Sequence, residues 1–233
     1  MIEACARYAV YYAPPPHSGL AVAGAAWLGH DPERGTPAAT LEVAGLPAPR
    51  EALVRRPRRY GLHATLKAPF RLPEGVPPQA LHEALTALAA ARRPVTAPPL
   101  RVDADMGFVA LRLSAPSAEV DALAAACVTE LDPLRAPLTG EELAERRRGG
   151  LDPQEEANLR SWGYPHVLGA FRFHITLTGP LARAEAAQAA DALAAALAPA
   201  LPPVFVLGAL CLFGDPGEGA PFRLLRRYPL TGR

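Results

Sequence analysis

GLHATLKAPF at Gly61–Phe70 and RFHITLTGPL at Arg172–Leu181 are the two stretches of this 233-residue sequence that decide its fold. Each contains His-x-Thr-Leu, followed two positions on by a small residue and then proline. The two histidines, His63 and His174, are too far apart in the chain to belong to one local motif. One copy falls in each half, so the sequence predicts a duplicated structural unit.

Both stretches carry alternating polar and apolar residues, which is typical of a β-strand with one exposed face. Residues i and i+2 of a strand point to the same face of a sheet. In the first stretch His63, Thr65 and Lys67 are therefore expected on one face, with apolar residues behind them. The equivalent residues of the second stretch are His174, Thr176 and Thr178. Each copy thus presents an imidazole beside a hydroxyl.

The segments around the motifs predict an α+β fold. Each half reads as a His-Thr strand, a helix, a strand, a turn and a strand. Strands are expected over 7–12, 100–102, 107–113, 171–178, 204–213 and 222–228, and helices over 20–28, 50–55, 79–91, 117–131 and 183–197. We therefore predict a bilobal duplicated unit of two antiparallel sheets with helices packed outside. A pseudo-two-fold axis would bring the two His-Thr faces together across a cleft.

The chain is expected to form one bilobal domain over residues 1–233, with motif 1 in 61–70 and motif 2 in 171–181. The segment at about 132–162 is charged and broken by glycine and proline, so we interpret it as a helical insertion between the halves. Its second helix is expected over 153–162. Whether this insertion is a lid or packing is left open.

Bulk composition limits the classes of partner. The formal net charge is +1, which argues against a broad basic surface for long nucleic acid. Three scattered cysteines indicate no disulfide framework and favour a reducing, cytoplasmic setting. The N-terminus lacks a signal-peptide pattern and the apolar runs are too short to span a bilayer, so no membrane partner is expected. Oligomeric state is not predicted.

The paired HxT motifs resemble those of the 2H phosphoesterases, a superfamily that includes cyclic nucleotide phosphodiesterases and 2′-5′ RNA ligases. RYAVYYAPPP, YGLHATLKAPFRL and WGYPHV followed by FRFHITLTGPL resemble one branch, the phosphonate-metabolism proteins of the DUF1045 type. The resemblance covers nearly the whole chain. It implies the bilobal α+β fold, a metal-independent attack on a phosphodiester and no cofactor. It also implies a setting beside the carbon–phosphorus lyase pathway, whose intermediates include a cyclic ribose phosphate.

The chemistry of the motif residues suits that expectation. Two imidazoles with ordinary pKa values of about 6.5 can act as general base and general acid near neutral pH. The resemblance assigns these roles to His63 and His174 and phosphate binding to Thr65 and Thr176, without fixing which histidine is the base. A small phosphorylated substrate is expected. Further residues expected to contact it are Lys67, Tyr11, Arg172, Thr178 and Tyr164.

Three other functions remain open from the residues. The same fold could act on RNA ends, as a 2′,3′-cyclic phosphodiesterase or a 2′-5′ ligase-like enzyme. A non-catalytic phosphate-binding protein is the second, although binding alone does not require two proton-transfer groups. A zinc hydrolase is the third and weakest, because the pair supplies two nitrogen ligands without a patterned third. No metal site is therefore expected.

Overall fold

An antiparallel seven-stranded sheet in the order β4-β5-β6-β2-β1-β8-β9 runs through the computed structural model, which describes residues 2–232. A separate two-stranded sheet pairs β3 with β7. The strands are β1 (Arg7–Tyr12), β2 (Ala64–Phe70), β3 (Val95–Ala97), β4 (Leu100–Asp103), β5 (Ala110–Leu113), β6 (Ile175–Thr176), β7 (Phe205–Leu207), β8 (Ala209–Asp215) and β9 (Arg223–Pro229). Both HxT motifs therefore lie in the middle of one sheet, on β2 and β6.

The helices begin and end where local chemistry dictates. The side chains of Ser18, Ser117, Thr139 and Asp152 accept hydrogen bonds from the first turns of their helices. Gly163 ends α6 with a φ of 72°, a conformation that favours glycine. The helices are α1 (Gly19–Leu28), α2 (Arg50–Val54), α3 (Pro78–Ala90), α4 (Ala118–Glu130), α5 (Gly140–Arg147), α6 (Pro153–Trp162) and α7 (Arg183–Leu197), with single 3₁₀ turns at Pro57–Arg59, Asp132–Leu134, Leu168–Ala170 and Ala198–Ala200.

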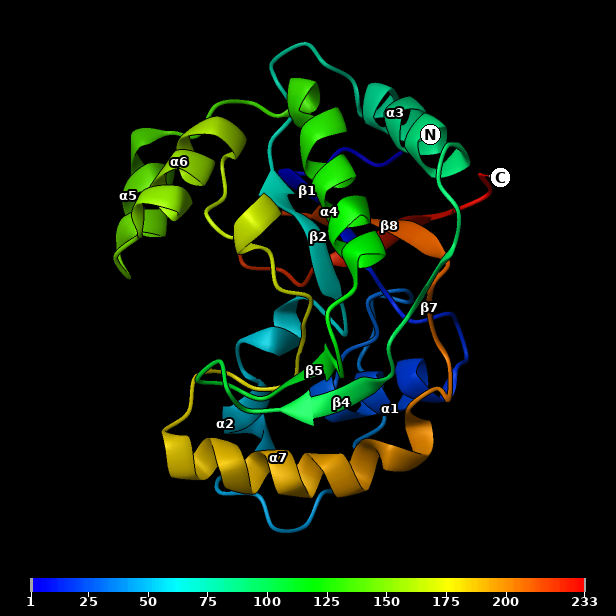
Figure 1. Cartoon of the computed structure of the whole chain (residues 1–233), viewed down its shortest axis with the longest axis vertical. Coiled ribbons are helices and arrows are strands. Elements are labelled where there is room, and N and C mark those ends of the chain that lie inside the picture. The colour runs from blue at the N-terminus through cyan, green and yellow to red at the C-terminus, as the bar shows by residue number, and fades with distance from the viewer. Residues whose placement is uncertain (1, 233) are drawn as a thin grey trace.

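The two halves of the chain exchange strands. The order β1, α1, β2, α3, β4 recurs as β5, α4, β6, α7, β8, and apart from the edge strand β9 the sheet order is symmetric about the β2–β6 pair. β4 consequently pairs with β5 of the second half, and β8 pairs with β1 of the first. Figure 1 shows the resulting two lobes, with α3 and α4 covering β1, β2 and β8 above, and α1 and α7 covering β4 and β5 below.

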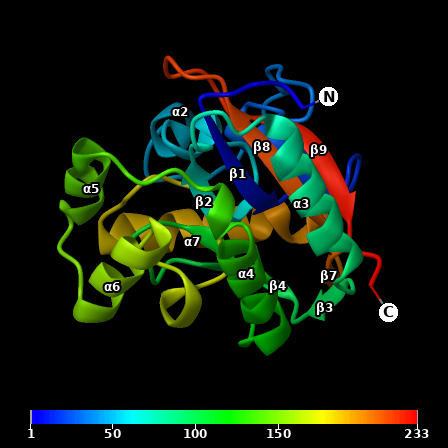
Figure 2. The same ribbon diagram turned by 90° about the horizontal axis from the view of Figure 1, so that it is seen from above.

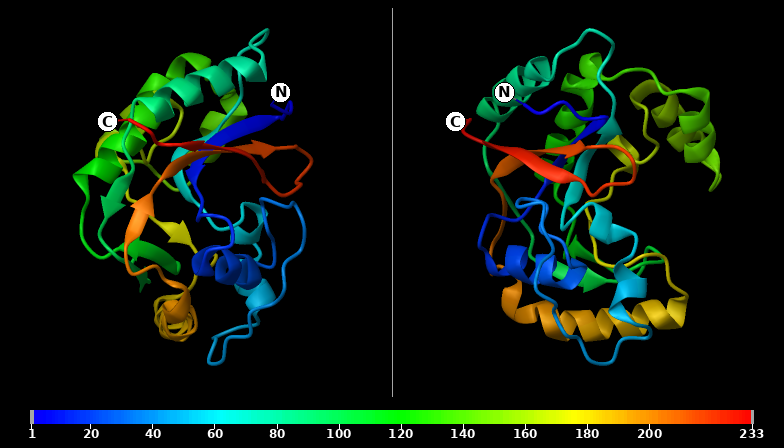
Figure 3. Two further views of the ribbon diagram at one scale, coloured as in Figure 1. Left: turned by 90° about the vertical axis from the view of Figure 1, so that its right-hand side faces the viewer. Right: turned by 180° about the vertical axis from the view of Figure 1, so that it is seen from behind.

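The remaining helices flank this arrangement. Figure 2 shows α5 and α6 together at one side of the molecule, beyond α4 and β2. The two views of Figure 3 show the sheet curving between the upper helices and α7 at the base. The 132–162 segment therefore forms a separate pair of helices that borders the motif strand β2.

The core lies on both sides of β1. Tyr8, Val10 and Tyr12 join the large cluster beneath the helices, whereas Ala9 and Tyr11 join a smaller cluster on the opposite face. A strand that is buried on both faces is expected to read as a nearly continuous apolar run, as RYAVYY does. Burial on both faces fixes the position of β1 beside β2, and hence the position of the first motif.

The predicted α+β fold with antiparallel strands and external helices is confirmed. The expected helices are all present, including the one over 153–162. Three strand predictions were too long: 204–213 divides at Gly208 into β7 and β8, 171–178 contracts to the two residues of β6, and 107–113 contracts to β5. Among residues 2–232, no helix combines the length and the apolar composition needed to cross a membrane.

Candidate active site

The two motifs are brought together by pairing between β2 and β6. Ala64 and Ile175 are direct cross-strand partners in an antiparallel pair. Continuing that register places His63 beside Thr176 and Thr65 beside His174 on the face opposite the helices. Neighbouring Cβ atoms in such pairs lie about 4.5–5.5 Å apart. All four side chains are partly exposed, so two imidazoles and two hydroxyls share one accessible surface.

Both imidazoles are oriented by the same local hydrogen bond. Nδ1 of His63 lies 2.9 Å from the carbonyl oxygen of Gly61, and Nδ1 of His174 lies 2.8 Å from the carbonyl oxygen of Arg172. A carbonyl can only accept, so Nδ1 carries the proton at both histidines. This leaves Nε2 of each ring free to take or give a proton at the open surface.

Burial favours the neutral form of both histidines. It lowers the pKa of His63 from 6.5 to about 4, with His174 adding to the effect and the hydrogen bond to Gly61 opposing it. The pKa of His174 is also lowered, first by burial and then by Arg112 and His166, against its bond to Arg172. At neutral pH the free site therefore holds unprotonated Nε2 atoms.

The ring of Tyr11 packs against the imidazole of His63. Its ring centroid lies 4.0 Å from that of His63 and 5.0 Å from that of Phe213. The side chain is only 1% exposed, so it holds the imidazole in place and offers little surface to a ligand. The expectation that Tyr11 contacts substrate is corrected accordingly. Burial raises the pKa of Tyr11 well above its usual value.

Lys67 does not share the face of His63 and Thr65, which corrects the second expectation. Thr65 pairs with Tyr11 but Lys67 pairs with Val10, so Leu66 is an extra residue and forms a β-bulge. The bulge turns Lys67 toward α4, where it is 3% exposed and its Nζ donates to the carbonyl oxygen of Val128 at 2.9 Å. Burial lowers the pKa of Lys67 to about 8.

Thr178 is likewise structural rather than exposed. Its hydroxyl accepts from the Val109 amide at 2.9 Å and donates to the Gly179 carbonyl oxygen at 2.9 Å, and the residue is 1% exposed. The alternation that predicted a face shared with Thr176 fails because β6 ends at Thr176.

The last two expected contacts lie at the edge of the surface. Arg172 is exposed and donates to the carbonyl oxygens of Gly169 and Phe171, while its own carbonyl orients His174. Tyr164 is partly buried, with its ring 5.6 Å from that of His166. Tyr164 lies close enough to Tyr11 to raise the pKa of that phenol.

The sequence of the chain matches a known protein family. Residues 65–223 match the sequence model of the family described as "Protein of unknown function (DUF1045)". The chain belongs to the DUF1045 family. This confirms the branch to which the flanking motifs pointed.

Two curated relatives of this DUF1045 chain carry the description "Ribose 1,5-bisphosphate phosphokinase PhnN". One, from Janthinobacterium sp. (strain Marseille), is 40% identical over a 238-residue alignment that covers 99% of this chain and 52% of the relative. Another, from Laribacter hongkongensis (strain HLHK9), is 40% identical over 223 residues, covering 94% of this chain and 51% of the relative. The chain spans about half the length of the curated relatives it matches.

Two solved structures are similar over 98% of this chain and 99% of their own. One is described as a phosphoesterase (15% identity, TM-score 0.45) and another as E. coli LigT complexed with NADP+ (16% identity, TM-score 0.39). At these values the similarity supports no inference about activity.

Sequence reasoning missed several residues that the fold places at the surface of this DUF1045 site. The ring of Tyr60 lies 5.6 Å from that of His63, and Phe108 lies 5.7 Å from His174. Arg112 follows Ala110, the partner of Thr176, at a same-face position and lowers the pKa of His174. Alternation along 107–113 could have suggested Arg112. Nothing in the sequence alone relates Phe108 to a histidine on a distant strand.

Metal ligands and cavities do not mark the site. Among residues 2–232, no three His, Cys, Asp or Glu side chains are placed to share a metal ion. A cavity of about 480 Å³ lies between α1, the 31–39 segment and β9, and neither motif histidine lines it. The His-Thr surface is therefore defined by the sheet and its side chains, not by that cavity.

Proposed function

We propose that this chain is a metal-independent phosphodiesterase that opens a small cyclic phosphate ester with His63 and His174 as its acid–base pair. The observation that carries the proposal is the β2–β6 pairing, which sets two imidazoles with free Nε2 atoms beside two threonine hydroxyls. A phosphate group on this surface would meet one proton acceptor, one proton donor and two neutral hydrogen-bond donors.

The reaction balances with these groups alone. Nε2 of the base takes a proton from water as the water oxygen forms a bond to phosphorus. The bond from phosphorus to one ring oxygen breaks, and Nε2–H of the acid protonates that oxygen. Thr65 and Thr176 donate to the non-bridging oxygens, where negative charge builds up. The product is an acyclic phosphomonoester, and each histidine has exchanged one proton.

We assign the base to His63 and the acid to His174. His63 has a pKa lowered to about 4, so it is neutral at neutral pH and ready to accept a proton. A bound phosphodiester anion favours a proton on the neighbouring imidazole, and His174 lacks the rings of Tyr11 and Tyr60 that surround His63. One proton shared by the pair is therefore expected on His174.

A cyclic ribose phosphate of phosphonate catabolism is the substrate class we propose. Two relatives that share 40% identity are described by a reaction of ribose 1,5-bisphosphate, and this chain matches about half of their length. A domain that opens a cyclic ribose phosphate would supply a phosphorylated ribose to such a kinase. The motif resemblance to phosphonate-metabolism proteins supports the same class.

The test follows ring opening by phosphorus NMR in the presence of a chelator. The protein is incubated with 5-phosphoribosyl 1,2-cyclic phosphate and, separately, with 2′,3′-cyclic nucleotides. Turnover of the ribosyl compound that falls about 10²–10⁴-fold in His63→Ala and in His174→Ala supports the proposal. His17→Asn, at an exposed histidine outside the sheet, is the matched control.

Each contrary outcome selects an alternative. Turnover of nucleotides alone would assign the chain to RNA-end processing. Loss of all activity in chelator would indicate a metal enzyme. Binding without turnover of either compound would leave a phosphate-binding protein and overturn the catalytic assignment.

A further inference from the structure

Arg146, in the last turn of α5, lacks a carboxylate partner within the described chain. The arginines around it all have one: Arg147 pairs with Glu156, Arg148 with Glu145, and Arg71 with Glu142. No such pair forms at Arg146, whose hydrogen bond goes to the carbonyl oxygen of Pro69 at 3.5 Å. Glu142, Glu145 and Glu156 are thus engaged by other arginines, and Arg146 has no ion pair of its own.

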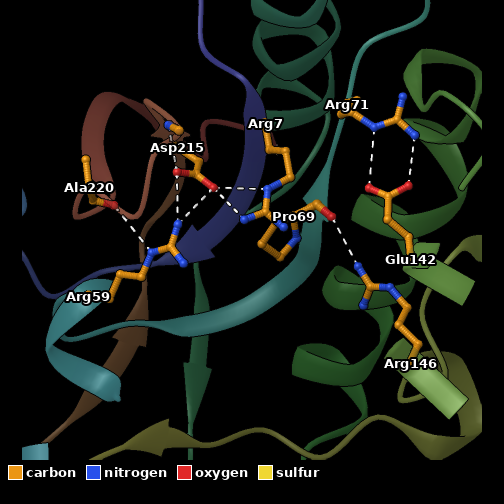
Figure 4. A network of polar contacts seen from close by, with 9 residues as sticks. Arg7, Arg59, Pro69, Arg71, Glu142, Arg146, Asp215 and Ala220 are labelled. Atoms are coloured by element: carbon orange, nitrogen blue, oxygen red, sulfur yellow. Dashed lines mark hydrogen bonds and ion pairs between the residues drawn. The ribbon is translucent and has the colours of Figure 1, made fainter. Parts of the chain in front are cut away.

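This guanidinium is directed inward, toward β2. Figure 4 shows Arg146 reaching from α5 to Pro69, while Arg71 and Glu142 pair beside it. Its Cζ lies 5.0 Å from the ring centroid of Tyr164, and the side chain is partly buried. Burial lowers the pKa of Arg146, with Tyr164 and Glu142 opposing the effect. A cation held in this way favours an anionic ligand over water.

Tyrosines connect Arg146 to the catalytic surface. Tyr164 and Tyr60 both lie close enough to Arg146 to act on its pKa, and the ring of Tyr60 is 5.6 Å from that of His63. Tyr11, stacked on His63, is influenced by the same two phenols. Arg146 is thus bonded to β2, the strand that begins directly after His63, and lies near two phenols, one of which contacts that histidine.

Positive charge is in excess along this border. Arg7 and Arg59 share the single carboxylate of Asp215, as Figure 4 shows, and Arg7 is near enough to Arg146 to lower its pKa. With the Arg71–Glu142 pair included, four guanidinium groups stand against two carboxylates. An anion bound between these arginines offsets the excess positive charge.

We propose that Arg146 and Tyr164 form a subsite for a second phosphate group, a phosphomonoester carried by the cyclic phosphate substrate. This inference rests on the proposed function and narrows its substrate to sugar cyclic phosphates that bear another phosphate. The planar guanidinium can hold two phosphate oxygens at once, and the Tyr164 hydroxyl adds a donor. The role of the 132–162 segment is then substrate selection, because α5 supplies the arginine and the residues after α6 supply the tyrosine.

The experiment compares two substrates that differ by one phosphate. Initial rates are measured for 5-phosphoribosyl 1,2-cyclic phosphate and for ribosyl 1,2-cyclic phosphate, with the intact protein, Arg146→Gln, Arg146→Lys and the control Arg147→Gln. We expect the intact protein to prefer the phosphorylated compound in kcat/KM. Arg146→Gln should reduce that preference about 10- to 100-fold, mainly through KM, and Arg146→Lys should restore part of it. Arg147→Gln should keep it.

A preference that is unchanged in Arg146→Gln would overturn the subsite. An equal loss on both substrates, with a lowered thermal midpoint, would assign Arg146 to structure and would also overturn it. Titration calorimetry with the phosphorylated compound separates this inference from the proposed function. If no variant turns over either compound, the function fails, and the subsite stands only if Arg146→Gln weakens binding while Arg147→Gln does not.

Discussion

At the scale of single residues, backbone carbonyl groups determine which ring nitrogen of each motif histidine carries the proton. Each motif histidine bonds through Nδ1 to the carbonyl oxygen two residues before it, at Gly61 and at Arg172. The bond is local, so each HxT stretch carries its own orienting group into the fold. Burial then lowers both pKa values, most strongly at His63, whose pKa falls to about 4.

The pH profile of kcat/KM tests these pKa shifts. In the proposed mechanism the base His63 must be unprotonated, so activity should rise as pH increases through about 4. The acid His174 must be protonated and its pKa is below 6.5, so activity falls again on approaching neutrality. We expect a bell-shaped profile with its maximum between these values. A profile that keeps rising above pH 7 would contradict the assignment of His174 as the acid.

Thr176 and Thr178 form a matched pair that separates catalysis from stability. Thr176→Val removes a donor to the phosphate, and we expect about a 10²-fold loss of kcat with little change in stability. Thr178→Val leaves the buried amide of Val109 without its partner, and we expect a loss of about 1–3 kcal/mol in the free energy of unfolding. Urea unfolding and steady-state kinetics on both variants check this. The reverse pattern would return Thr178 to the site.

At the scale of elements, the bulge in β2 assigns the roles of neighbouring residues. Thr65 remains on the face of His63, whereas Lys67 is directed beneath α4 with its Nζ 3.7 Å from Asp132. A buried ammonium with few partners disfavours its own charged form, which explains the pKa of about 8. Because of the bulge, Lys67 links the sheet to α4 and is not the phosphate ligand that the sequence predicts.

Lys67→Met should show, through a change in the pH dependence of stability, that the Lys67 ammonium is buried. Between about 8 and 10.5 the unfolded chain binds more protons at Lys67 than the folded chain, so the free energy of unfolding rises with pH. The slope is at most about 1.4 kcal/mol per pH unit. We expect this rise in the intact protein and its absence in Lys67→Met, measured by urea unfolding. Parallel curves, or a large loss of kcat in the variant, would contradict the buried position.

At the scale of the whole molecule, strand exchange joins the two lobes. β4 and β8 each pair with strands of the other half, and β2 pairs with β6 at the centre of the sheet. Neither half of the chain contains all the neighbours that its strands require. The His-Thr surface spans this junction, so its geometry depends on both lobes being folded.

Cooperative unfolding is the expected consequence. The two tryptophans report on different regions: Trp27 in α1 donates to the Leu177 carbonyl oxygen in the lower lobe, and Trp162 ends α6 beside the upper lobe. In Trp27→Phe and Trp162→Phe, the remaining tryptophan should show the same urea midpoint as circular dichroism of that variant. Separate midpoints within one variant would show that the lobes unfold independently.

The sequence by itself determined the helices, most strands and the pair of motifs, because periodicity and capping act over a few residues. His63, Thr65, His174 and Thr176 could be selected from spacing alone. The sequence did not determine where the side chains of Lys67, Thr178 and Tyr11 lie. A bulge, a strand end and burial on both faces of a strand depend on partner strands. Nor did the sequence relate Arg146 of α5 to Pro69 of β2, which only the tertiary structure brings within hydrogen-bonding distance. Local patterns thus fixed which groups are present, and the tertiary structure decided which of them share a surface, because long-range strand pairing and packing set the position of each side chain.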